Sequence, residues 1–131
     1  MKKYTNISTF YLILGLFMGI SYREITKHNN FTGETVLSSV HTHTHTLGYL
    51  FFLIVLLLDY TFKLSAIKSF KQWIVAYNIS LLYLVITLTL WGVCEVFGTD
   101  IAGLNHIAGL GHAFLGISLV WFVIILRKAV K

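Results

Sequence analysis

The chain has 131 residues, of which 56% are hydrophobic and 11% are charged. A water-soluble domain of this size cannot bury so much apolar surface, so the composition excludes an ordinary soluble protein and indicates a membrane protein. The formal net charge of +5 could suggest a nucleic-acid partner. The basic residues, however, gather between the apolar runs, where they orient a membrane protein. We therefore expect the lipid bilayer, and no nucleic acid, among the partners.

Four apolar runs are each near or above the roughly 20 residues that a helix needs to cross the hydrocarbon. They cover about residues 7–26, 38–59, 72–95 and 103–126. Proline is absent, and the links between the runs are short. The first run lacks a small-residue cleavage site, so we expect it to be a retained helix. The sequence predicts an all-α, integral membrane, antiparallel four-helix bundle that forms a single domain over residues 1–131.

Basic residues indicate which side of this bundle is cytoplasmic. They precede the first run, fill the link between the second and third runs, and follow the fourth: Lys2, Lys3, Lys63, Lys68, Lys71, Arg127, Lys128 and Lys131. With four spans, these three segments lie on the same side of the membrane. An excess of lysine and arginine marks that side as the inner one, so we expect both termini in the cytoplasm.

The second run opens with SSVHTHTHTLG at residues 38–48, in which three histidines alternate with threonines. This run enters the membrane from the outer side, so the histidines fall in its first two turns. At about 100° per residue, His41 and His45 share a helix face with Gly48, whereas His43 lies roughly opposite and is expected to be peripheral. An extended entry to the span would instead put all three histidines on one side.

The third run ends at the same outer level with Cys94 and Glu95. An acid in or near a span is a functional candidate, because burying it without a partner is expensive. Glu95 could bind a metal, accept a proton, or hydrogen-bond the far side of a ligand histidine. The alternative is a solvated carboxylate among the lipid headgroups. Cys94 is the single cysteine, which excludes an internal disulfide.

The fourth run opens with GLNHIAGLGHAFLG at residues 103–116 and also runs inward from the outer side. His106 and His112 therefore lie at the level of the other histidines. Gly109 and Gly116 flank His112 on its helix, and glycine beside a ligand histidine opens a flat slot that a planar macrocycle can use. Close packing of helices is the other common use of such small residues.

Imidazole is a good axial ligand for haem iron, and facing helices of a bundle can supply two of them. We predict a haem b held by His45 and His112, about two turns inside the outer boundary, with Arg23 able to meet a propionate. His41 and His106 lie nearer the surface and could bind propionates, hold a second metal or exchange protons. Electron transfer or haem sensing and handling would follow, with a quinone or another redox partner.

A metal ion without a porphyrin is the alternative ligand. Zinc or copper could bind His41, His45, His112 and Glu95, because imidazole and carboxylate suit these ions. The protein would then be a metal-dependent enzyme or a transporter. A third reading has no cofactor, and the histidines form a pH-sensitive outer surface. Small residues in the first run also offer a seam for a homo-oligomer.

Together, HTHTHTLG and GLGHAFLG resemble a family of small four-helix bacterial membrane proteins of unassigned function, over essentially the whole chain. This resemblance implies a multi-pass protein of the bacterial cell (inner) membrane. The first motif alone is also similar to a His-x-His-Leu pattern of the haem-copper oxidase and nitric-oxide reductase superfamily, which implies haem or copper ligation by His41, His43 or His45. Those enzymes have many more spans and a vicinal histidine pair that is missing here. We therefore expect no oxygen or nitric oxide reduction.

Overall fold

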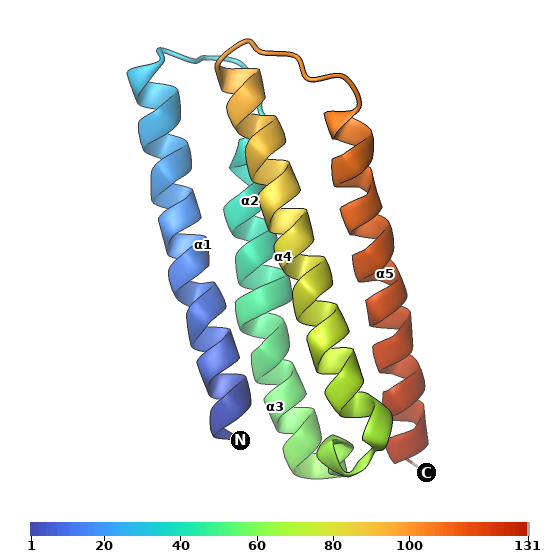
Figure 1. Cartoon of the computed structure of the whole chain (residues 1–131). Coiled ribbons are helices and arrows are strands. Elements are labelled where there is room, and N and C mark those ends of the chain that lie inside the picture. The colour runs from blue at the N-terminus through green and yellow to red at the C-terminus, as the bar shows by residue number, and fades with distance from the viewer. Residues whose placement is uncertain (131) are drawn as a thin grey trace.

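The computed structural model describes residues 1–130 and consists of antiparallel helical rods (Figure 1). In chain order the elements are α1 (Lys2–His28), α2 (Leu37–His43), the π-helix η1 (Thr44–Leu50), α3 (Phe51–Phe62), the 3-10 helix η2 (Leu64–Ala66), α4 (Lys68–Val96) and α5 (Leu104–Ala129). We call α2, η1 and α3 together the second rod, because they form one continuous helical segment. The four rods are long and apolar enough to cross a membrane, so the predicted all-α membrane bundle is confirmed.

The two ends of the bundle differ in what they carry. Both termini and η2 lie at one end, which we call the terminal end (Figure 1). The links at residues 29–36 and 97–103 lie at the other, which we call the histidine end because the histidine motif begins beside it. The rods extend beyond the predicted apolar runs at nearly every end. Many of the added residues are charged, such as Lys2, Lys68 and Arg127, and therefore lie outside the apolar runs. Which end faces the cytoplasm stays a prediction from the charges.

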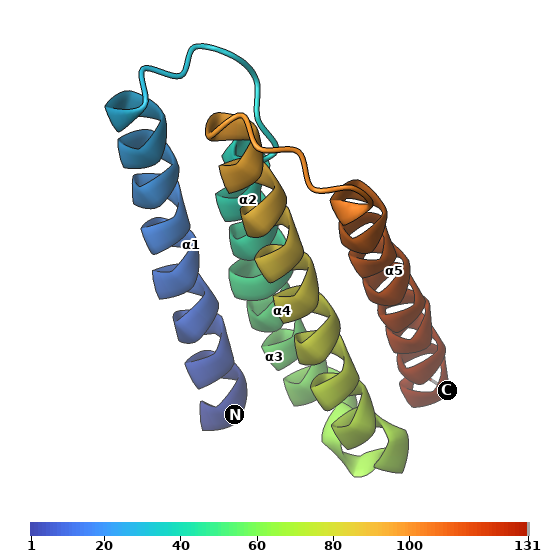
Figure 2. The same cartoon turned by 45° about the horizontal axis from the view of Figure 1, so that its top comes forward.

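The four rods of the bundle are not equally in contact with one another. α1 packs mainly against the second rod, and α5 packs mainly against α4. Figure 2 shows α1 and α5 on opposite flanks of the central pair formed by the second rod and α4. The outer faces of both flanking helices expose large apolar side chains, such as Phe17 and Ile20 on α1 and Ile117 and Val120 on α5. These faces suit contact with lipid.

An aromatic cluster joins the second rod to α4 and α5 toward the terminal end. Ring centroids lie 4.6 Å apart for Trp73 and Phe122, and 4.9 Å apart for Phe51 and Tyr77. Trp73 Nε1 donates a hydrogen bond to the Ser118 carbonyl at 2.8 Å. Pairs of this kind contribute about 0.5–1.5 kcal/mol each beyond their buried area. The cluster therefore holds the rods together at a distance from the histidines.

Candidate functional site

The histidine motif is helical throughout, but the helix changes its pitch within it. α2 ends at His43, and η1 continues from Thr44 with the wider π-helical turn. Neighbouring rods donate to two carbonyls of η1: Tyr77 Oη bonds the Leu47 carbonyl at 2.9 Å, and Ser8 Oγ bonds the Tyr49 carbonyl at 2.9 Å. Segments of π-helix are frequent at functional sites. The helical backbone excludes the extended entry that would have aligned all three histidines.

His41 and His45 face α1. Their ring centroids lie 6.4 Å apart at an interplanar angle of 84°. Two glycines of α1 stand opposite: a Cβ added at Gly15 would lie 2.6 Å from His45 Nε2, and one added at Gly19 would lie 3.7 Å from His41 Cβ. The backbone of α1 therefore approaches the imidazoles directly. The prediction that these two histidines share a face is confirmed.

Two ring nitrogens of this pair are buried without a hydrogen-bond partner among residues 1–130. They are His41 Nδ1 and His45 Nε2. A buried polar atom left without a partner costs about 1–3 kcal/mol, and native proteins rarely retain one unless a water or an ion meets it. The His41–His45 pair is therefore a candidate binding site for an ion or a small ligand.

His43 and His112 form a second pair on another side of the second rod. Their ring centroids lie 5.8 Å apart, at an interplanar angle of 84°. His43 Nδ1 lies 2.8 Å from the Ser39 carbonyl. A carbonyl only accepts, so Nδ1 donates and carries the proton, which leaves the lone pair of Nε2 for a ligand bond. His43, expected to be peripheral, is thus half-buried and oriented by its own helix.

The predicted meeting of His45 with His112 is not the arrangement in this structure. Residues two positions apart in a helix point to different sides. Because His43 faces α5, His45 faces α1. His112 consequently lies beside His43, and His45 lies against Gly15. The sequence contained the signal for this result, because the helical angles already separated His43 from its neighbours. The sequence contained no signal for the side of the second rod on which α5 would pack.

The glycines flanking the histidines differ in their surroundings. A Cβ added at Gly109 or Gly116 would meet nothing within 4 Å, so α5 presents an open strip on either side of the exposed His112. Gly48 is enclosed instead, because a Cβ there would collide with the Tyr11 ring. The predicted slot on α5 therefore has room in front of it. Gly48, predicted to line a cofactor, serves the close contact between the second rod and α1.

Glu95 holds the start of the second rod. Its Oε2 accepts a hydrogen bond from the Val36 backbone N–H at 2.8 Å. Thr35 Oγ1 accepts from the Leu37 N–H and donates to the Gly92 carbonyl, both at 3.1 Å. A carboxylate at a helix N-terminus satisfies a free N–H and interacts favourably with the helix dipole. No sequence pattern indicated this role, because the partners lie far apart along the chain.

The four side chains predicted to bind zinc or copper do not come together. Residues 1–130 contain no group of three or more histidine, cysteine, aspartate or glutamate side chains placed to hold one metal ion. His41 and His45 face α1, His112 lies on α5 beside His43, and Glu95 is bonded to the start of α2. The histidines therefore form two pairs in place of one cluster.

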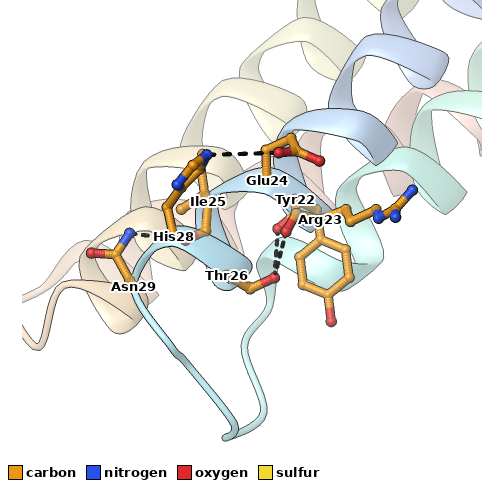
Figure 3. Close-up of polar contacts among 7 residues, drawn as sticks. All are labelled: Tyr22, Arg23, Glu24, Ile25, Thr26, His28 and Asn29. Atoms are coloured by element: carbon orange, nitrogen blue, oxygen red, sulfur yellow. Dashed lines mark hydrogen bonds and ion pairs between the residues drawn. The ribbon is translucent and has the colours of Figure 1, made fainter.

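Two predicted surface residues lie near the histidine end. His106 is exposed in the first turn of α5. Arg23 is exposed near the end of α1, and its side chain points away from the ion pair of Glu24 and His28, whose atoms are 3.7 Å apart (Figure 3). Arg23 shares a flank with the His41–His45 pair, whereas His106 shares a helix with His112. A role for either residue with propionates stays a prediction.

Comparison with known proteins gives a family but no function. A family model described as "Protein of unknown function (DUF2871)" matches residues 1–129. No curated protein and no solved structure matches the chain. The predicted resemblance to a small four-helix family of unassigned function is therefore confirmed. The similarity to haem-copper oxidases finds no support in these comparisons.

Proposed function

The chain belongs to the DUF2871 family of proteins of unknown function, and we propose that it is a membrane b-type haem protein with His43 and His112 as axial ligands. One observation carries the proposal: two imidazoles from different helices lie side by side within a membrane bundle. Two imidazoles on opposite sides of one metal ion have ring centres roughly 6 Å apart, because each metal–nitrogen bond is about 2 Å long. The 5.8 Å between these two centroids is close to that value.

The hydrogen bond behind His43 supports the same proposal. Histidine ligands of metals usually donate their second ring nitrogen to a carbonyl or carboxylate, which fixes the tautomer and strengthens the ligand. The Ser39 carbonyl, 2.8 Å from His43 Nδ1, fills that role. This bond holds the His43 ring in one orientation.

The open strip on α5 supports a flat guest rather than a small ion. Gly109 and Gly116 leave space on both sides of His112 that the flat macrocycle of a haem could occupy. Because α5 and α1 lie on opposite flanks, Arg23 is remote from this haem. We expect His106, nearer the histidine end of α5, to be the propionate partner.

The proposed ligation limits the chemistry. A haem with histidine on both axial positions has no open site for a substrate, so single-electron transfer or haem handling suits it better than catalysis at the iron. A quinone dissolved in the bilayer is the natural redox partner for a protein embedded in the same lipid.

An absorption spectrum tests this function. The full chain, expressed with haem available and purified in detergent, should be red, with a Soret band and sharp α and β bands after reduction. His43→Ala and His112→Ala should each abolish this bis-histidine spectrum. His45→Ala, in the same motif, is the matched control and should keep it. Colourless wild-type protein would refute haem binding, and loss of the spectrum in His45→Ala alone would refute the proposed pair.

A further inference from the structure

We infer that His41 and His45 form a second, separate site, which binds a single cuprous ion between the second rod and α1. The site does not depend on the proposed haem, because its side chains face the opposite flank of the bundle. α1 covers it, whereas the proposed haem lies beside α5.

Two ring nitrogens of this pair indicate a binding site. His41 Nδ1 and His45 Nε2 are both buried and both lack a hydrogen-bond partner among residues 1–130. They belong to rings on one helix face with centroids 6.4 Å apart. A ligand that accepts two nitrogen lone pairs would satisfy both atoms at once. Helix packing alone gives no reason to bury two ring nitrogens without a hydrogen-bond partner.

The composition of the site selects the ion. No third histidine, cysteine, aspartate or glutamate within residues 1–130 joins the pair as a ligand group. Structural zinc requires about four ligands, and a divalent ion in a neutral, buried site is expensive. Cuprous copper carries a single charge and can be coordinated by only two ligands in a linear arrangement. Imidazole is a suitable ligand for copper. Two imidazoles in a line across such an ion place their ring centres roughly 6 Å apart.

Gly15 and Gly19 make the site testable without touching a ligand. A methyl group at position 15 would lie 2.6 Å from His45 Nε2, so Gly15→Ala must displace the imidazole or α1. A methyl group at position 19 would only touch His41, at 3.7 Å or more, which is ordinary van der Waals contact. The same chemical change, one helical turn apart, thus affects the nitrogen in one variant and spares it in the other.

The experiment is a competition for copper. The full chain in detergent is mixed with cuprous copper, kept reduced by ascorbate, and a coloured chelator of that ion. We expect the wild type to withdraw one equivalent of copper. His41→Ala, His45→Ala and Gly15→Ala should each weaken binding more than tenfold, and Gly19→Ala should leave it unchanged. Thermal unfolding checks that each variant is folded.

Two results would overturn the inference: a folded wild type that withdraws no copper, or equal withdrawal by the wild type and the His41→Ala/His45→Ala double variant. Equal weakening by Gly15→Ala and Gly19→Ala would also refute the contact on which it rests. His112→Ala separates this site from the proposed haem. It should lose the haem spectrum and still withdraw one equivalent of copper, so either proposal can fail without the other.

Discussion

Glu95 illustrates how a single side chain can acquire a role that its residue type does not reveal. An acidic residue at the end of a span is a candidate to bind a metal or a proton. The Glu95 carboxylate instead accepts a hydrogen bond from the Val36 N–H, where the second rod begins. The bond joins α4 to the segment that carries the histidine motif. The depth of the histidines in the membrane therefore depends on this contact as well as on the apolar run that follows them.

Removing this carboxylate should loosen the start of the second rod. We expect Glu95→Ala to lower the free energy of unfolding by about 1 kcal/mol, as for the loss of a helix cap. Glu95→Gln retains an acceptor oxygen and should have a smaller effect. Thermal unfolding in detergent measures both, with Glu24→Ala as the control, because the Glu24 side chain is 47% exposed. Unchanged stability in Glu95→Ala, together with lost copper or haem binding, would make Glu95 a ligand.

At the scale of the element, the second rod owes its shape to its neighbours. A run of alternating histidine and threonine contains no residue that demands a π-helix. The carbonyls of Leu47 and Tyr49 receive hydrogen bonds from Tyr77 on α4 and Ser8 on α1. Both donors come from other rods, so the wider turn is stabilised by tertiary contacts.

Loss of either donor should therefore destabilise η1. Tyr77→Phe and Ser8→Ala each remove one hydrogen bond, and each should cost about 0.5–1.5 kcal/mol. Hydrogen exchange of the amides at residues 44–50 should become faster in both variants. Tyr60→Phe is the control, because Tyr60 is 72% exposed. Unaltered exchange in Tyr77→Phe would show that η1 is stable without its neighbours.

At the scale of the whole molecule, the arrangement of the rods gives the second rod different neighbours on different sides. α1 covers one, with glycines against His41 and His45, and α5 borders the other, with His112 beside His43. Because the two pairs face different helices, each pair can bind its own ligand.

The orientation of the bundle in the membrane follows from its charges. We expect the terminal end to be cytoplasmic, because the links and termini there carry the excess of lysine and arginine. In a Cys94→Ser background, a cysteine at exposed Thr99 should react with a membrane-impermeant maleimide in intact cells. A cysteine at exposed Ser65 should react only after the membrane is opened. The reverse pattern of labelling would invert the topology.

Length and hydropathy by themselves determined the class of protein, the four spans and the level at which the histidines meet, because crossing the hydrocarbon requires long apolar helices. Helical periodicity also determined that His41 and His45 share a face. Only the tertiary structure decided which helix each face meets: α1 for His45, and α5 for His43. The pitch of η1 and the partner of Glu95 were decided there too. The physical reason is that periodicity fixes angles around one helix axis, whereas the neighbour on each side is chosen by packing between rods that are distant in the chain.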